Sequence, residues 1–460
     1  MTDPARLLPP TPRHLRGRRF GLVLAAVLVA VLAVAMGSGC GRSERSAARA
    51  DAENGVVRLT YWSSQNPQER ALADTLVRRW NAAHPGVQVT LQPIPAGQSS
   101  EEVLLAAIVG RTTPDLCSNV WPGILADFVR ARGVVRLDTM PGFEATMARV
   151  PEALRGGFVS ADGGTYQIPW KTNPILMLVN RGMLREAGVA AIPRTYSEYL
   201  AAATRVTADT DGDGQRDRWM GYRDTRPIWW QRYFDVYPLY IAASGGRTYF
   251  DARGRLDVDT LASDAVFGFF QTLFARGDFP RTTFQGNPFV EGKIATEFTG
   301  PWSAADLAER APPGLDYAYA PLPVPDGTPP GAPVYTYGDY KNIALFSTSR
   351  HPREAWAFAQ YLVSEEADRL LVRMTRQMPL RSGIADDPAL ADFYTANPAV
   401  RPFALAAEAT RGVDAVPQLP EVLDAVSQAF ERAVYGAETP REATQSALRR
   451  IALIQSWSTR

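Results

Sequence analysis

The side chains of this sequence that are best suited to bind a ligand are tryptophans that stand beside amides and charged groups. Asn119 and Trp121 come at the end of a short apolar segment, and Trp170 is followed by Lys171 and Asn173. A flat indole ring can cover the apolar C–H face of a sugar-like ligand, while amides and charged groups bond to its hydroxyls. In a chain with ten tryptophans, this pattern indicates binding rather than a covalent reaction.

A second chemical pattern is the acidic run at residues 209–217, which reads D-x-D-x-D-G-x-x-D. Oxygen ligands at alternate positions and a glycine at the sharp turn resemble the start of a calcium loop. The twelfth position is Met220, where such a loop carries a bidentate glutamate. Two interpretations stay open, a structural calcium ion and a plain polar turn. The candidate metal ligands are Asp209, Asp211, Asp213, Gln215 and Asp217.

Histidine and cysteine, which carry much of enzymatic and metal chemistry, are scarce. The three histidines are His14, His84 and His351, and the sequence has no HExxH, paired CxxC, P-loop or GxGxxG motif. This leaves little room for a Ser-His-Asp triad or a histidine zinc site. Cys117, one of two cysteines, lies in an apolar segment and is expected to be a small buried residue.

The first forty residues predict export. Arginines at 13–19 precede an uninterrupted apolar run, Phe20 to Met36, which leads through Gly-Ser-Gly to Cys40. This order resembles a bacterial lipoprotein leader, so we expect residues 1–39 to be a signal peptide and Cys40 to hold the chain, by lipid, on the outside of the cell membrane. An uncleaved anchor is the alternative, because about 17 apolar residues reach the lower limit for a bilayer span. Residues 40–55 are typical of a flexible tether.

The charge balance argues against a nucleic-acid partner. Residues 1–39 hold five of the 49 basic and one of the 48 acidic residues, so the remainder has 44 basic and 47 acidic residues. A slightly negative chain offers no electrostatic footprint for nucleic acid. A hydrophobic content of 46% and this length are typical of two globular domains.

Apolar periodicity predicts an α/β fold. A strand at 56–62, a helix at 68–83 and a strand at 87–91 form a unit that implies a parallel sheet covered by helices. Strands are also expected at 115–119, 166–168 and 176–180. Further helices are expected at 101–109, 123–132, 196–207, 229–243, 264–275, 353–362, 365–374, 421–434 and 440–456.

Several segments together resemble the extracellular solute-binding proteins of bacterial ABC importers, the maltodextrin-binding-like sugar family. Their order and spacing over residues 56–450 carry the resemblance more than any single motif. The matching segments are 162–169 (DGGTYQIP), 178–188 (LVNRGMLREAG), 196–200 (YSEYL), 289–302 (FVEGKIATEFTGPW), Gly338, Ile343, 355–362 (AWAFAQYL) and 379–381 (PLR).

The resemblance implies a two-lobed clamp of the type II periplasmic-binding-protein class, each lobe a mixed sheet flanked by helices. The chain is expected to cross between lobes near 168–169, 295–296 and 340–343. One lobe would then hold residues 56–168 and 296–340, and the other residues 169–295 and 341–460. A ligand in the cleft would close the lobes, and the closed form would be presented to a membrane permease.

The family pattern also implies which residues contact the ligand. Trp302 aligns with a stacking tryptophan. Trp229 and Trp230 are adjacent, so about 100° apart on a helix, and one is expected to line the cleft while the other packs. For Trp62, a position in the hydrophobic core is the alternative to a ligand contact. The full set of expected ligand contacts is Trp62, Gln65, Asn66, Asn119, Trp121, Trp170, Asn173, Trp229, Trp230, Trp302, Tyr337, Gly338, Asp339 and Arg381.

The function that the resemblance implies is that of a monomeric, non-enzymatic protein that captures a carbohydrate for an ABC importer. A polyol or glycerol phosphodiester is the alternative ligand, which Lys171 keeps open. A secreted glycoside hydrolase or lyase would need two carboxylates across a sugar bond, and the expected cleft segments offer few besides Asp224, Asp235 and Asp339. A sensory ectodomain of the same fold is the third alternative.

Overall fold

The computed structural model describes residues 55–97, 99–251, 253–414 and 416–458. Contacts group the chain into two units, and the larger, residues 59–84 and 89–460, contains most of both main sheets. The smaller is described only at 55–58 and 85–88. The expected signal peptide and Cys40 lie outside the described residues. Within the described ranges, no helix has the length and apolar character needed to cross a membrane.

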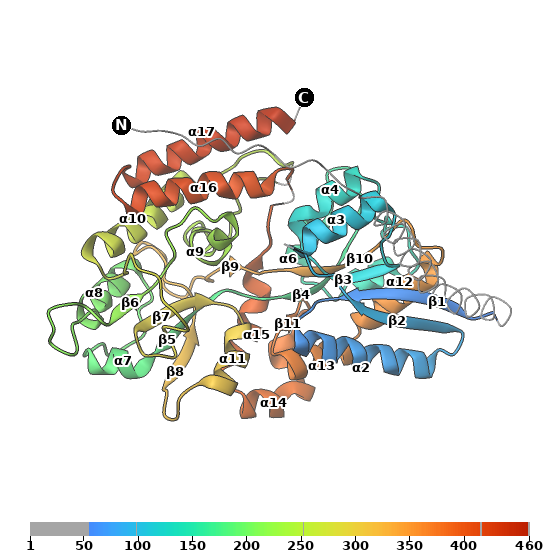
Figure 1. Cartoon of the computed structure of the whole chain (residues 1–460), viewed down its shortest axis with the longest axis horizontal. Helices are drawn as coiled ribbons and strands as arrows, with labels where there is room; N and C mark the ends of the chain where they lie inside the picture. Colours follow the sequence, from blue (N-terminus) through green and yellow to red (C-terminus); the bar gives the residue numbers. More distant parts are fainter. Residues whose placement is uncertain (1–54, 98, 252, 415, 459–460) are drawn as a thin grey trace, which may run out of the picture. The chain divides into compact units, whose positions relative to one another are not determined.

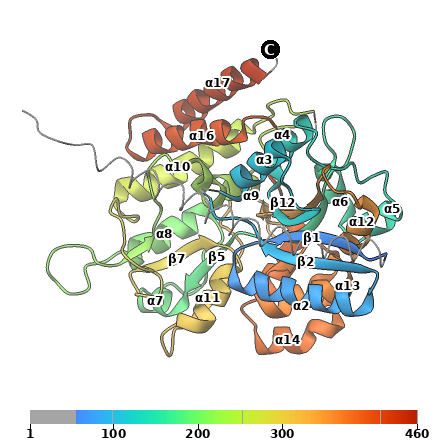
Figure 2. The same cartoon turned by 45° about the vertical axis from the view of Figure 1, so that its right-hand side comes forward.

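The first main sheet has six strands in the order β11-β4-β10-β3-β1-β2 (Figure 1). Strand β1 runs parallel to β3, while β10 is antiparallel to both β3 and β4. Helices α3 and α4 lie on one face of this sheet, and α2 and α13 lie on the other (Figures 1 and 2). The strands are β1 Val57–Ser63, β2 Val87–Pro93, β3 Leu116–Val120, β4 Ile168–Thr172, β10 Lys341–Leu345 and β11 Met378–Pro379, and the helices are α2 Pro67–Ala83, α3 Ser100–Gly110, α4 Leu125–Arg130, α12 Pro352–Leu362 and α13 Glu365–Thr375.

The second main sheet has four strands in the order β6-β7-β5-β8, with β5 antiparallel to both β7 and β8. Helices α10, α16 and α17 pack on one another and form a helical layer in the same half of the protein as this sheet (Figure 2). The strands are β5 Leu176–Asn180, β6 Trp219–Gly221, β7 Ile294–Thr299 and β8 Tyr317–Ala320, and the helices are α7 Arg181–Glu186, α8 Tyr196–Val206, α9 Val236–Ala243, α10 Thr260–Arg276, α11 Trp302–Arg310, α16 Leu419–Val434 and α17 Pro440–Ser458.

A third, two-stranded parallel sheet joins β9 Thr336–Tyr337 to β12 Thr410–Arg411. It brings the segment that leads into β10 beside a late segment of the chain. The remaining elements are short helices: α5 Phe143–Met147, α6 Glu152–Arg155, α14 Ala391–Ala396, α15 Arg401–Ala406, and the 3₁₀ helices η1 Pro122–Ile124, η2 Gly156–Phe158, η3 Trp229–Phe234, η4 Ile384–Asp386, η5 Pro388–Leu390 and η6 Ala407–Ala409.

Local sequence explains where the main helices begin. Helix α2 has a proline at its first position, and the Asn66 side chain accepts hydrogen bonds from the backbone N–H groups of Gln68 and Glu69. Its buried residues include Leu72, Leu76 and Trp80, which recur at helical spacing. Helix α8 begins with a capping box between Thr195 and Glu198. These elements follow their local signals, and their predicted positions are confirmed.

Other expectations need correction. The predicted helix over 229–243 is two elements, the 3₁₀ helix η3 and helix α9, separated at Asp235, whose backbone is not helical. The lobe boundaries expected at 296 and 341 do not follow sheet membership. Strands β7 and β8 belong to the second main sheet, although 296–340 was expected in the first lobe, and β10 belongs to the first sheet, although 341–460 was expected in the second lobe. Long-range strand pairing, which local sequence does not encode, decides both memberships.

Candidate ligand-binding cavity

A cavity of about 410 Å³ opens beside the second main sheet. Its walls come from strand β7, the 3₁₀ helix η3, the segment after β6, residues 286–288 and the first residue of α11. Two tryptophans line it with much of their surface exposed, Trp230 at 49% and Trp302 at 40%. Large apolar rings rarely stay exposed in pairs at one concave site without a partner, so this cavity is the strongest candidate ligand site.

Both indole rings are held in place by their neighbours. The Phe234 ring lies edge-on to Trp302 at a centroid distance of 5.7 Å and to Trp230 at 6.4 Å. A Cβ atom on Gly300 would come within 2.2 Å of the Trp302 ring, so only glycine allows the indole to fold back over this turn. The adjacent Trp229 is part-buried and packs against the core instead. The two adjacent tryptophans therefore have different environments, as expected.

Charged side chains share the cavity wall with these rings. Asp224 is ion-paired with Arg226, whose hydrogen bonds hold the pKa of Asp224 below its usual value. Asp235 lies 3.1 Å from the buried Arg232 guanidinium, and burial raises the pKa of Asp235. Burial also raises the pKa of Glu297 on β7. The cavity wall therefore combines aromatic rings with polar groups. This combination suits a ligand that presents both apolar C–H surfaces and hydroxyl groups.

Three more predicted residues meet in an aromatic cluster beside the cavity. Trp121, directly after β3 of the first sheet, is 7% exposed and lies 6.0 Å from Trp229 and 5.7 Å from Tyr233 between ring centroids. Tyr233 stacks on Tyr337 of β9 at 5.0 Å. Phe234 links this cluster to the cavity, because its ring lies 6.2 Å from Tyr337. The end of β3, the 3₁₀ helix η3 and strand β9 thus converge here.

Strand β4 of the first sheet carries the buried ion pair of Lys171 with Glu69. Lys171 is buried, and its Nζ donates a hydrogen bond of 2.6 Å to Glu69. Burial alone would raise the pKa of Glu69, but the Lys171 ammonium holds that pKa below its usual value. Trp170 is also buried, with the Lys171 ammonium 4.8 Å from the centre of its ring. Both residues are engaged within the protein.

Asn173, Gly338 and Asp339 meet where β9 leads into β10. The backbone N–H of Asp339 donates to the Asn173 carbonyl at 3.2 Å, and the Asp339 carboxylate accepts from the Tyr337 hydroxyl at 3.2 Å. A Cβ atom on Gly338 would lie 2.4 Å from the Thr172 hydroxyl, so glycine permits this close approach. The buried Asn173 Oδ1 atom has no hydrogen-bond partner among the described residues.

The other predicted contacts lie outside the cavity wall and have local roles. Trp62 is buried in the core cluster of the first sheet, and Gln65 donates to a backbone carbonyl at 2.8 Å. Asn66 caps helix α2. Asn119 has a positive φ of 71° at the end of β3. Arg381 forms ion pairs with two buried aspartates, at 3.2 and 2.5 Å.

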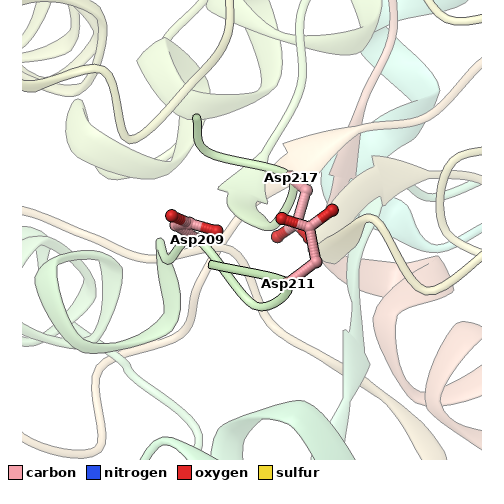
Figure 3. A group of neighbouring side chains, drawn as sticks. All are labelled: Asp209, Asp211 and Asp217. Atoms are coloured by element: carbon pink, nitrogen blue, oxygen red, sulfur yellow. The ribbon is translucent and has the colours of Figure 1, made fainter. Parts of the chain in front are cut away.

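Three of the five predicted metal ligands converge. Carboxylate oxygens of Asp209, Asp211 and Asp217 lie within 4.8 Å of one another (Figure 3), and Asp213 is outside this group. Both Asp209 oxygens already accept backbone hydrogen bonds, at 2.7 and 2.8 Å. Both Asp217 oxygens are also bonded, to the backbone N–H and hydroxyl of Thr210. Three carboxylates fit a hard cation, but the same geometry also closes the turn without one.

A second cavity is larger, about 1150 Å³, and lies along residues 189–205 and 320–334. Its wall contains no tryptophan and none of the predicted contacts. We assign the ligand site to the smaller cavity, because binding depends on the groups that line a cavity more than on its volume.

Sequence reasoning missed several residues of the cavity wall. Phe234 was hidden inside an expected regular helix. Arg223 follows strand β6, and Glu297 lies within strand β7. A single carboxylate in the otherwise uncharged strand I-A-T-E-F-T was the one sequence signal that could have pointed to Glu297. Gln231 and Asn287 add side-chain amides to the same wall.

The chain is similar to known proteins in both sequence and structure. A family model described as "Bacterial extracellular solute-binding protein" matches residues 63–369. The maltotriose-binding protein of Pyrococcus abyssi is 23% identical over 74% of this chain and 70% of its own length. The arabinooligosaccharide-binding protein of Halalkalibacterium halodurans is 24% identical over 74% and 76%. The sugar-binding protein MalE of Xanthomonas citri has a similar structure, with a TM-score of 0.71, 20% identity, and coverage of 88% of this chain and 98% of that chain.

Proposed function

This chain belongs to the family of bacterial extracellular solute-binding proteins, and we propose that it captures a carbohydrate and delivers it to the permease of an ABC importer. The fold is the two-lobed α/β clamp of periplasmic binding proteins, which the likeness to MalE shows. An extracytoplasmic location follows from the family. The relatives that bind maltotriose and arabino-oligosaccharides support a carbohydrate as the ligand.

The observation that carries the proposal is the pair of exposed indoles, Trp230 and Trp302, in one cavity. Each offers a flat apolar face, and the amides and charged groups between them can bond to hydroxyls. The wall of the cavity lies beside an aromatic cluster in which Trp121, directly after β3 of the first sheet, meets Tyr233 of η3. A ligand that extended from the cavity to this cluster would favour closure of the clamp, because it would contact groups of both lobes.

The location and partners complete the proposal. Lipid on Cys40 would keep the protein at the membrane surface, where the permease lies. The closed, loaded clamp would be the form that the permease accepts. We also propose that the protein acts as a monomer without catalytic activity, so that the sugar leaves the cavity chemically unchanged.

The alternative ligands receive less support. The glycerol phosphodiester alternative rested on Lys171, which is buried and bound to Glu69, and the carboxylates of the cavity wall would repel a phosphate. A hydrolase would need a general acid and a second carboxylate, whereas Asp224 and Asp235 are each bound to an arginine, which leaves Glu297 as the one cavity-wall carboxylate without an ion pair among the described residues. A calcium ion at Asp209, Asp211 and Asp217 remains part of the proposal, as a brace for the loop rather than a participant in binding.

The proposal is tested with the chain from Gly41 onward and a panel of mono-, di- and oligosaccharides. Ligand that binds only the native state raises the melting temperature, and tryptophan fluorescence reports on the cavity. We expect at least one sugar to do both and to be recovered unchanged. Release of a shorter sugar would establish an enzyme, and a response to polyols or phosphodiesters alone would replace the carbohydrate as ligand.

A further inference from the structure

One carboxylate of the cavity wall differs from the other carboxylates there in its hydrogen bonding among the described residues. Glu297 lies on β7, is part-buried and lines the cavity. Within the described part of the chain, its carboxylate accepts no hydrogen bond and forms no ion pair, unlike Asp224 and Asp235 of the same wall. A ligand that covers this part-buried carboxylate would have to supply hydrogen-bond donors, because a covered carboxylate without a partner is costly. Its position therefore indicates a group that arrives with the ligand.

Arg223 supplies the complementary feature. Its guanidinium lies over the Phe298 ring at 5.0 Å, and one of its terminal N–H groups donates to the Phe298 carbonyl at 2.8 Å. The Nε atom of Arg223 is buried and has no hydrogen-bond partner among the described residues. Arg223 and Glu297 line the same cavity, and the positive charge of Arg223 acts on the Glu297 carboxylate. An unused donor and an unused acceptor thus stand in one wall.

The chemistry of these two groups selects the ligand. A hydroxyl group donates one hydrogen bond and accepts others, so hydroxyls can satisfy Glu297 and Arg223 together. A ligand carboxylate cannot donate to Glu297 and would be repelled by it, whereas a ligand ammonium cannot accept from Arg223. A neutral sugar can therefore satisfy both groups with any of its hydroxyls, whereas the charged group of a uronic acid is repelled by Glu297 and that of an amino sugar by Arg223.

We propose that Glu297 and Arg223 form the specificity-determining polar pair of the cavity and restrict it to a neutral, hydroxyl-bearing sugar ring stacked on Trp302. This inference rests on the proposed function and adds the class of sugar. Glu297 accepts from one ligand hydroxyl, and Arg223 donates to that hydroxyl or its neighbour. The indole of Trp302 supplies the apolar face, and the polar pair sets which ring is accepted.

The test is isothermal titration of the chain from Gly41 onward with three sets of oligosaccharides. The neutral set contains maltotriose and arabinotriose, the acidic set trigalacturonate, and the basic set chitosan trimer. The variants are Glu297→Gln and Glu297→Ala, with Glu309→Gln as the control because Glu309 is an exposed acid of α11 outside the cavity wall. Circular dichroism and the melting temperature check that each variant folds, and the isosteric Glu297→Gln serves if Glu297→Ala does not.

We expect the wild type to bind a neutral oligosaccharide and neither charged set. Loss of a hydrogen bond to a charged acceptor should weaken binding about 10- to 100-fold in Glu297→Ala, and less in Glu297→Gln. The control should bind as the wild type does. Unchanged affinity in the Glu297 variants, or wild-type preference for the acidic or basic set, would overturn the inference while leaving a carbohydrate-binding function in place. If the wild type binds no sugar, the proposed function fails, and the inference fails with it.

Discussion

Replacement of Trp302 by alanine is the most direct test of the cavity. The Trp302 ring is 40% exposed and belongs to none of the main core clusters. Its ring contact is an edge-on one with Phe234. The protein nevertheless covers the rest of the side chain, about 150 Å² of up to about 250 Å², so Trp302→Ala should lower the free energy of unfolding by up to about 4 kcal/mol. The melting temperature therefore has to show that the variant is folded before its loss of ligand binding is measured.

The expected loss of affinity follows from area. A tryptophan side chain offers up to about 250 Å², so an exposed fraction of 40% leaves about 100 Å² for a ligand to cover. At about 25 cal/mol per Å² this area contributes about 2.5 kcal/mol. Incomplete cover by the sugar lowers this value and favourable stacking raises it, so we expect about 1.5–3 kcal/mol, or about a 10- to 150-fold rise in Kd.

The assay is calorimetric titration with whichever sugar binds the wild type. Trp457 provides a matched control, because it is 50% exposed but lies on α17, outside the cavity wall. Trp457→Ala should leave Kd unchanged, and Trp302→Phe should fall between the wild type and Trp302→Ala. An unchanged Kd in a folded Trp302→Ala variant would refute the assignment of the cavity, and an equal effect in Trp457→Ala would show that the loss is not local.

Three further outcomes are expected. Burial raises the pKa of Asp414 from 3.8 to about 6. The contribution of Asp414 to the free energy of unfolding is therefore complete below pH 3.8 and falls by about 3 kcal/mol as the pH rises through 6. Urea unfolding at pH 4 and pH 8 should differ less in Asp414→Asn than in the wild type, and an equal difference would contradict this. Calcium chloride should raise the melting temperature of the wild type but not that of Asp211→Asn, and magnesium chloride should raise neither. No rise in the wild type would show that residues 209–217 form a plain polar turn. Arg149 donates hydrogen bonds to both carboxylate oxygens of buried Asp368 at 2.7 Å, so Arg149→Ala should lower the free energy of unfolding by about 3 kcal/mol. Arg149→Lys, which keeps the positive charge, is the control. A loss below about 1 kcal/mol in Arg149→Ala would contradict this prediction.

The fold could be predicted from local patterns where these are long and regular. The apolar strand that became β5 and the amphipathic helix α2 have clear periodicity and, in α2, a cap at Asn66. Strand β7 was missed because Thr296 and Glu297 interrupt its apolar run. Strands β6, β9, β11 and β12 have only two or three residues, which is too short for a periodic signal, and pairing with distant segments creates them.

The site could be predicted in part. Trp302 was expected because it aligns with a stacking tryptophan of the family, and Trp230 was expected as one of two adjacent tryptophans; both line the cavity, and their contact with a ligand stays a prediction. Asn66 and Arg381 carry the same chemistry, yet one caps a helix and the other binds buried carboxylates. Residue type tells what a side chain can do, whereas its neighbours decide whether that capacity is already used.

The sequence by itself determined the α/β class, most long helices, the family and the aromatic character of the binding surface, because these depend on local periodicity, caps and motifs. Only the tertiary structure decided which sheet received β7, β8 and β10, and which aromatic rings stayed exposed. It alone placed Glu297, which has no hydrogen bond or ion pair among the described residues, in one cavity wall with Arg223. The physical reason is that strand pairing, burial and hydrogen-bond satisfaction depend on residues far apart in the chain, which become neighbours only when the whole chain has folded.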